Sequence, residues 1–174
     1  IADFWSMLQG FQTSGKCIEK AHYRIRYMKS FRPLSMKEDI EFREARPILY
    51  LNTAAVASLF NSRNAGATSN RSNWSTIMSY LKSHASYLGL KQDRFTILLP
   101  SGLPDYTIDI VNGEQVKKVK VNRPKALCFD YLQLKETFGL DLETEVVAEN
   151  QEEIPSESDA IDLQQLKQNE LPFE

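Results

Sequence analysis

Asn112-Gly113 stands between two runs, residues 107–111 and 116–121, in which apolar and polar residues alternate. Alternation with a period of two is typical of β-strands. Asn-Gly suits the tight type I′ turn, because both central residues of that turn have positive φ. The two runs are therefore predicted to form a β-hairpin. Its second strand carries Lys118 and Lys120 on one face, which makes the hairpin basic.

Residues 70–87 hold the clearest helical pattern. Trp74, Ile77, Met78 and Leu81 recur at i, i+3, i+4 and i+7, which places them on one stripe of a helix. Short polar side chains on the opposite face suit close contact with a phosphate backbone and base edges. An ordinary amphipathic helix with a serine-rich solvent face is the alternative. The polar face comprises Ser72, Asn73, Ser75, Thr76, Ser79, Lys82 and Ser83.

The remaining elements follow from weaker patterns of spacing and capping residues. Asp130 is predicted to cap a helix over residues 131–138, and Gly139 to end it. Arg24 and Arg26 are expected on the solvent face of their strand. The other predictions are a helix over 2–14, strands over 22–27, 47–51 and 95–99, a polar excursion over 28–45 attached by Phe31, Ile40 and Phe42, a helix starting at Asn52 or Thr53, a loop over 62–70, and a return to the core at Leu127-Cys128-Phe129.

This order of elements predicts an α+β fold, a winged helix-turn-helix-like domain with a basic β-hairpin wing and an acidic C-terminal tail. The recognition helix would span residues 72–83, and the wing would surround Asn112-Gly113. We expect the domain to cover residues 1–140, with a helix and strand-pair entry over 1–51 and the helix-turn-helix and wing over 52–140. Residues 141–174 form the tail, predicted to be disordered.

Charge is distributed unevenly between these two parts. Residues 1–140 hold 20 Lys and Arg against 12 Asp and Glu, a balance of +8, whereas residues 141–174 hold one Lys against 11 Asp and Glu, a balance of −10. A basic body favours contact with a polyanion, so DNA is the expected partner. The predicted DNA-contacting residues are Arg63, Asn70, Arg71, Ser72, Asn73, Ser75, Thr76, Lys82, Lys117, Lys118, Lys120, Arg123 and Lys125.

Several classes of function are disfavoured by what the sequence lacks. It has no nucleophile-elbow motif, no glycine-rich phosphate loop and no paired carboxylates outside charged runs, so no catalytic residue is assigned. Two histidines and two isolated cysteines, Cys17 and Cys128, predict no metal site, and we expect no cofactor. No apolar run approaches the roughly 20 residues needed to cross a bilayer, so we expect no membrane contact. Free thiols at the two isolated cysteines are the default in a reducing cytosol, so we expect a cytoplasmic location.

Three stretches resemble a known family: ILYLNTAAVASLF, IMSYLKSHASYLGLK and RPKALCFDYLQLKETFGLDL. They are similar to the C-terminal region of bacterial primase/helicase-type replication proteins carried by conjugative and other mobile elements. Its recurring features YLxxxxxYLG and RALCFDYxxLK are matched from Tyr80 to Gly89 and from Ala126 to Lys135. The resemblance covers about residues 1–142 and brings no catalytic residue. It implies an accessory domain of a DNA replication protein, with any enzymatic activity outside this chain.

The tail has a resemblance of its own. Its acidic run through Leu171, Pro172 and Phe173 is similar to the tip of bacterial single-strand DNA-binding proteins, which docks into basic, apolar pockets of replication partners. The departure is Glu174, which follows Phe173. The tail would then bind other replication proteins. The alternatives are a solubilising segment, or one that folds back onto the basic wing and competes with DNA.

The sequence therefore predicts a non-catalytic, DNA-binding accessory domain that acts through a recognition helix and a basic wing. The alternative is a winged-helix module that docks a replication partner protein through the same surface. The two differ in salt dependence, because DNA binding weakens steeply with salt.

Overall fold

A computed structural model describes residues 2–63 and 74–144. Within these two ranges the chain forms four helices and eight strands. In chain order they are α1 (Ala2–Thr13), β1 (Tyr23–Phe31), β2 (Ile40–Asn52), α2 (Thr53–Arg63), α3 (Trp74–Ser83), β3 (Tyr87–Gln92), β4 (Phe95–Thr96), β5 (Tyr106–Val111), β6 (Glu114–Val119), β7 (Val121–Asn122), β8 (Lys125–Asp130) and α4 (Tyr131–Phe138).

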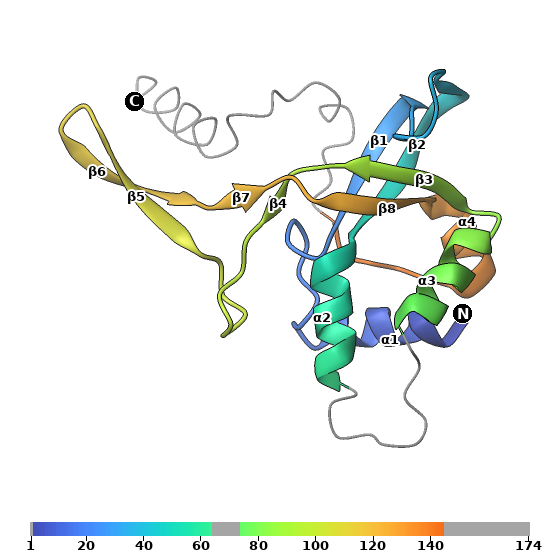
Figure 1. Ribbon diagram of the computed structural model, residues 1–174, viewed down its shortest axis with the longest axis horizontal. Helices are drawn as coiled ribbons and strands as arrows, with labels where there is room; N and C mark the ends of the chain where they lie inside the picture. Colours follow the sequence, from blue (N-terminus) through green and yellow to red (C-terminus); the bar gives the residue numbers. More distant parts are fainter. Residues whose placement is uncertain (1, 64–73, 145–174) are drawn as a thin grey trace, which may run out of the picture.

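The centre of the molecule is a four-stranded antiparallel sheet in the order β1-β2-β8-β3 (Figure 1). Leu49 of β2 pairs with Phe129 of β8, and Leu127 of β8 pairs with Leu90 of β3. The two middle strands contain unbroken apolar runs, ILYL in β2 and ALCF in β8, and all eight residues are buried. A strand without polar alternation is buried on both faces. The composition of β8 therefore explains its position inside the sheet.

All four helices cover one face of this sheet (Figure 1). The ring of Trp5 in α1 meets the ring of Phe129 edge-on, with 5.1 Å between centroids. Phe4 of α1 stacks on Phe60 of α2 at 4.9 Å. The helix α4 adds Leu134, which is fully buried. These large side chains form the main core, in which each helix buries one stripe of apolar residues.

The predicted apolar stripe of α3 is confirmed as core-facing. Leu81 is fully buried, and Trp74, Ile77 and Met78 pack against the main core. The predicted cap of α4 is also confirmed: the Asp130 side chain accepts a hydrogen bond from the Gln133 backbone N–H, and a left-handed glycine ends the helix. α2 starts after Asn52, whose Oδ1 atom accepts from the Ala55 backbone N–H at 3.4 Å.

The second face of the sheet has a smaller core of its own. Ile48, Tyr50, Ala126 and Cys128 point to this face, where Phe31, Phe95 and partly buried Met28, Ile40, Phe42 and Leu88 cover them.

The turn between β1 and β2 closes over the β3 edge of the sheet. The Leu34 backbone N–H donates to the Leu90 carbonyl at 2.8 Å, and Pro33 packs on Gly89. Gly89 has a φ of +127°, and a Cβ atom there would lie 2.5 Å from Pro33 Cβ. Glycine is therefore required for this close approach.

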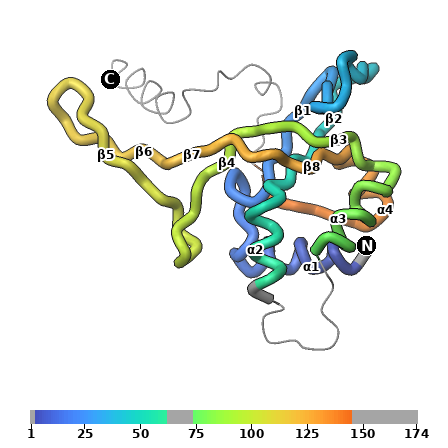
Figure 2. Tube along the Cα trace, in the orientation of Figure 1, coloured from blue at the N-terminus to red at the C-terminus, as the bar shows by residue number. Residues whose placement is uncertain are grey.

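A long two-stranded extension projects from the sheet. Beyond the β3–β8 pair the chain continues outward through the β4–β7 pair and then the β5–β6 pair, and the tube in Figure 2 shows this path leaving the body. We call residues 95–122 the arm. Its outer part, β5 and β6, joins the rest of the molecule through residues 97–105 and the short β7 strand.

The structure contradicts the predicted winged helix-turn-helix. The predicted wing is the tip of the arm, which lies on the other side of the molecule from α3 (Figure 1). Both strands that flank the arm, β3 and β8, belong to the central sheet, and strands dominate the described fold. The prediction failed because it gave residues 87–92 no strand and treated Leu127–Phe129 as a minor return. Those residues build half of the sheet, and this pairing carries the hairpin away from α3.

Other strand predictions were right in place and wrong in extent. The predicted pairing of residues 22–27 with 47–51 is confirmed, since Tyr23 lies opposite Leu51. The excursion over 28–45 contains the outer ends of β1 and β2, and Phe31, Ile40 and Phe42 attach it to the second core as predicted. Leu142 is buried just beyond the expected start of the tail at 141. Residues 145–174, and the predicted loop from 64 onward, lie outside the described residues.

Candidate protein-docking site on the arm

The tip of the arm forms the hairpin that the sequence predicts. β5 and β6 pair in an unbroken antiparallel register from Tyr106 opposite Val119 to Val111 opposite Glu114. Asn112 and Gly113 make the turn with φ values of +53° and +81°. Two successive positive φ values are the signature of a type I′ turn. The twist of that turn matches the twist of the strands, so the ribbon is regular up to its tip.

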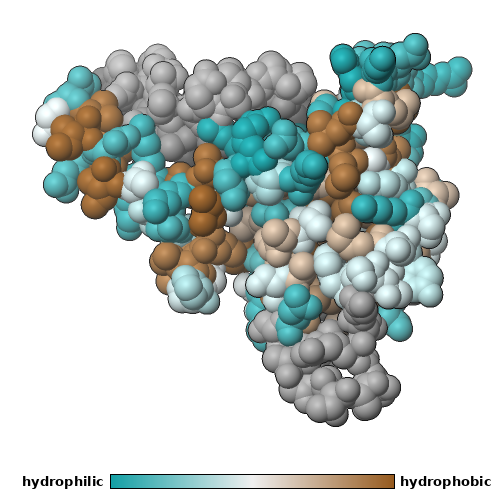
Figure 3. All heavy atoms as spheres, viewed as in Figure 1, coloured by the Kyte–Doolittle hydropathy of each residue, from teal (hydrophilic) through white to brown (hydrophobic). Residues whose placement is uncertain are grey.

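One face of this ribbon is apolar. Side chains alternate between the two faces of a ribbon, which places three large apolar residues of β5 together: Tyr106, Ile108 and Ile110 are 41, 65 and 72% exposed. Figure 3 shows apolar side chains gathered along the arm. The Lys117 ammonium lies 4.3 Å from the centroid of the Tyr106 ring. We call this set the apolar arm face: Tyr106, Ile108, Ile110, Gln115, Lys117 and Val119.

The opposite face of the ribbon is mixed: it carries Asp109, Glu114 and Lys118 beside Val111 and Val116. Lys118 Nζ lies 2.9 Å from the Asp109 carboxylate, and Lys120 Nζ lies 3.3 Å from the Asp105 carboxylate. The predicted sharing of one face by Lys118 and Lys120 agrees with this arrangement. Since two of the lysines expected to contact DNA already pair with carboxylates of the arm, the charge left to attract a polyanion is smaller than the sequence indicates.

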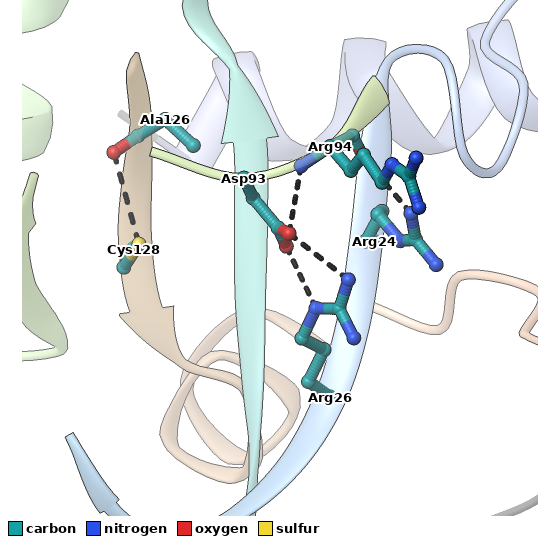
Figure 4. A network of polar contacts seen from close by, with 6 residues as sticks. All are labelled: Arg24, Arg26, Asp93, Arg94, Ala126 and Cys128. Atoms are coloured by element: carbon teal, nitrogen blue, oxygen red, sulfur yellow. Dashed lines mark hydrogen bonds and ion pairs between the residues drawn. The ribbon is translucent and has the colours of Figure 1, made fainter. Parts of the chain in front are cut away.

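The root of the arm is anchored to β1 by arginines. The segment from Asp93 to Thr96 leaves β3 and crosses the second face of the sheet to β1 (Figure 4). Arg26 donates from Nε and Nη2 to the two Asp93 carboxylate oxygens at 2.7 and 2.9 Å. Arg24 donates to the Arg94 carbonyl at 2.9 Å. Bidentate pairing fixes both distance and orientation.

Further contacts complete this anchor. Phe95 is fully buried in the second core. The Thr96 backbone N–H donates to the Lys20 carbonyl at 2.7 Å, and the Asp93 backbone N–H donates to the Pro124 carbonyl at 3.3 Å. The arm therefore leaves the body in a defined direction, held by a buried ring, an ion pair and backbone hydrogen bonds.

A cleft of about 810 Å³ lies between the root of the arm and the body. Its walls come from the segment after α1, the first two turns of α2 and the chain on either side of Pro100. Leu99 and Leu103 line it and are also exposed apolar side chains. We call this space the root cleft.

His22 also lines the root cleft, and its role is structural. Its Nδ1 atom accepts a hydrogen bond from the Ile18 backbone N–H at 3.0 Å. Burial lowers the pKa of the imidazole. The side chain is therefore neutral at pH 7 and holds the turn that precedes β1.

The predicted DNA-contacting residues do not converge on one surface. Ser75, Thr76 and Lys82 are exposed on α3, away from the arm (Figure 1). Arg63 ends α2, and Asn70, Arg71, Ser72 and Asn73 lie outside the described residues. The remaining five residues lie on the arm or at its base: Lys117, Lys118, Lys120, Arg123 and Lys125.

Sequence reasoning missed the two features that define the site. The alternation of Ile108 and Ile110 was visible, but it was used only to predict one strand of the hairpin, and Tyr106 lies just before that predicted strand. The pairing of Arg26 with Asp93 spans 67 positions and left no local signal. Arg26 was expected in solvent, whereas only 17% of its side chain is exposed, because the crossing segment covers it.

Metal-ligating side chains do not cluster in the described part of the chain. Over residues 2–63 and 74–144, no group of three His, Cys, Asp or Glu side chains is placed to hold a metal ion. No helix in these ranges has the length and apolar character needed to span a bilayer. Cys17 and Cys128 are free and buried, and burial raises the pKa of the Cys17 thiol to about 12. Such a thiol is unreactive at pH 7.

Comparison with known proteins adds no family to this description. The chain matches no family model, no curated protein and no solved structure.

Proposed function

We propose that this chain is a non-catalytic docking module whose arm binds a partner protein through the apolar arm face. The observation that carries the proposal is the exposure of Ile108 and Ile110 on an arm with a fixed root. Contiguous exposed apolar side chains on a folded protein mark interaction sites. A fixed direction of the arm supports the same reading, because a preorganised surface loses less entropy on binding.

The expected strength of docking follows from the exposed side chains. Full burial of an isoleucine side chain contributes about 2 kcal/mol. Ile108 and Ile110 are 65 and 72% exposed, so each would contribute roughly 1.3 kcal/mol when covered. Replacing both with serine is then expected to weaken docking by about 2.6 kcal/mol, or nearly 100-fold. Because both are exposed, the substitutions should change the free energy of unfolding by no more than about 0.5 kcal/mol.

A photo-crosslinking amino acid placed at position 110 of the full chain, in its native cells, tests this function. Position 34 serves as the matched control, because Leu34 is a 53% exposed apolar residue on the body. We expect a discrete protein adduct from position 110 that is absent from position 34, is lost in Ile108→Ser and persists at about 1 M salt, where charge interactions are screened. Identical adducts from both positions would refute the proposal.

Nucleic-acid contact by the arm is the second candidate, and the exposed cations at its base favour it. Lys117, Arg123 and Lys125 are exposed, and none of the three forms an ion pair within the described residues. We expect fluorescence anisotropy with labelled duplex and single-stranded DNA to decide it at two salt concentrations. DNA contact predicts binding that weakens steeply with salt and is reduced evenly across sequences by Lys117/Lys118/Lys120→Ala. Unchanged affinity in that triple variant would exclude the arm as a DNA site.

The resemblance to primase/helicase-type replication proteins suggests where the module acts. A docking domain of such a protein would bind another replication component in the cytoplasm. The two free, buried thiols support a reducing compartment.

A further inference from the structure

The described chain ends beside the root of the arm. The Thr144 hydroxyl donates to the Glu19 carboxylate at 2.8 Å, and the Tyr23 hydroxyl donates to the Glu143 carbonyl. The residue after Glu19 is Lys20, whose carbonyl accepts the Thr96 backbone N–H of the arm. Thr144, the last described residue, therefore lies near the place where the arm leaves the body.

The chemistry of residues 145–174 complements the apolar arm face. This segment holds nine Asp and Glu and one Lys, and its last part contains Ile161, Leu163, Leu166, Leu171 and Phe173. Residues 95–125 hold five Lys and Arg against three Asp and Glu. An acidic segment with spaced apolar residues can cover exposed isoleucines and also place a carboxylate beside Lys117.

The length of the segment is sufficient. Thirty residues can span up to about 100 Å when extended, whereas the six residues of β5 span about 20 Å. Tethering makes the contact intramolecular, with an effective concentration on the order of 1 mM. A weak intrinsic dissociation constant near 0.1 mM would then leave about 90% of molecules covered.

We propose that residues 161–173 of the same chain cover the apolar arm face and compete there with the partner protein. This inference rests on the proposed function, because both occupants use Tyr106, Ile108 and Ile110. A partner protein would have to displace the tail before it could dock. The apparent affinity of the partner is therefore about tenfold lower when 90% of molecules are covered by the tail.

A second copy of the chain fits the apolar arm face less well. Two arms packed face to face would bring two Lys117 ammonium groups into the interface, and none of the six residues of this face carries a carboxylate. Three large apolar side chains from each copy also fall short of the roughly 800 Å² per partner that stable interfaces bury. The acidic tail supplies the missing carboxylates.

Carbodiimide crosslinking of the full chain at low micromolar concentration tests the inference. This reagent joins lysines to carboxylates in direct contact. We expect crosslinks from Lys117 to carboxylates between 157 and 170. An equal mixture of ¹⁴N- and ¹⁵N-labelled protein separates the two geometries: crosslinks within one isotope support the proposal, and mixed-isotope crosslinks overturn it in favour of a second copy.

Two variants show whether the apolar contact carries the docking. Ile108→Ser/Ile110→Ser is expected to reduce the crosslink yield about tenfold, since a loss of nearly 100-fold in affinity would lower the covered fraction from about 90% to about 10%. Leu34→Ser is the matched control and should leave the yield unchanged. Equal yields in both variants would overturn the proposal, and urea unfolding midpoints verify that both are folded. Hydrogen exchange provides an independent readout. The tail should protect β5 amides from exchange, and neutralising Glu157, Asp159 and Asp162 should remove that protection.

These outcomes are separable from those for the proposed function. A partner adduct at position 110 without tail crosslinks would leave the docking function standing and refute the tail contact. Tail crosslinks without any partner adduct would leave the tail contact standing and refute the docking function.

Discussion

The ion pair at the root of the arm should contribute far more to stability than an equally short pair on the surface. In both the Arg26–Asp93 and the Arg32–Asp39 pair, an arginine Nε atom bonds a carboxylate, at 2.7 and 2.8 Å. They differ in exposure: the side chains are 17 and 10% exposed in the first pair and 57 and 38% in the second. The Nε–carboxylate distances are thus matched, and the pairs differ in burial and in the second hydrogen bond that Arg26 Nη2 donates to Asp93.

Asp93→Ala should lower the free energy of unfolding by about 3 kcal/mol, because it leaves the Arg26 guanidinium buried without its carboxylate. It also removes the acceptor that the Arg94 backbone N–H uses at 2.7 Å. Asp39→Ala should cost about 0.5 kcal/mol, since water and salt screen that pair. A cost of 3 kcal/mol lowers the ratio of folded to unfolded chains about 150-fold.

Double-mutant cycles measured by urea denaturation provide the assay. The cycle of Asp93→Ala with Arg26→Met should give a coupling energy of about 2 kcal/mol, and that of Asp39→Ala with Arg32→Met one below about 0.5 kcal/mol. Trp5, which is buried in the main core, reports unfolding by fluorescence. Coupling energies that agree within about 0.5 kcal/mol would refute the reasoning, because burial and bidentate pairing would then have no effect.

Three further predictions concern stability. Gly89→Ala should destabilise the protein by about 3 kcal/mol, because Gly89 has a positive φ and a Cβ atom there would clash with Pro33. Gly10→Ala should instead stabilise it by about 0.7 kcal/mol, because Gly10 lies in α1 with open space around it. Urea unfolding midpoints compare the two variants, and midpoints that shift in the same direction would contradict the geometry. Asp130→Ala should lower the free energy of unfolding by about 2 kcal/mol, because it removes both the cap of α4 and the 2.7 Å ion pair with Arg46. Asp130→Asn should lower it less, because asparagine still caps the helix and loses only the ion pair. Equal urea midpoints for the two variants would be inconsistent with the capping role. Burial raises the pKa of Cys17 from 9.0 to about 12 and also raises that of Tyr23. The unfolded chain therefore loses protons above about pH 9 that the folded chain keeps, and the free energy of unfolding should fall as the pH rises from about 9 to about 12. Cys17→Ala should reduce that fall, and an unchanged slope would argue against it.

Local patterns predicted the elements whose causes are local. The Asn112-Gly113 turn, the Asp130 cap and the stripe from Trp74 to Leu81 were all readable, because the responsible groups lie within a few positions of each other. The strand β3 could not be predicted from such a local pattern. Tyr87-Leu88-Gly89 follows a helix directly and has no alternation. Its strand conformation depends on pairing with β8, almost 40 positions away, and on Pro33, which packs against Gly89.

The candidate site shows the same division. The two faces of the hairpin follow from the alternation in β5 and β6 and could have been assigned from the sequence. Whether Ile108 and Ile110 face a core or solvent depends on where the hairpin is attached. That attachment is decided by Asp93 and Phe95, which turn the chain across the sheet to β1, and no spacing rule links Asp93 to Arg26.

The pattern on the arm is difficult to explain by stability alone. A two-stranded ribbon in water gains little from apolar side chains that stay exposed, and soluble proteins protect such ribbons with charges and polar residues. One face of this ribbon follows that practice with Asp109–Lys118 and Asp105–Lys120 pairs. The other face presents isoleucines, on a support whose direction is set by buried contacts. Because the same ribbon has charge pairs on one face and exposed isoleucines on the other, the apolar arm face is best explained by a second molecule or segment that covers it.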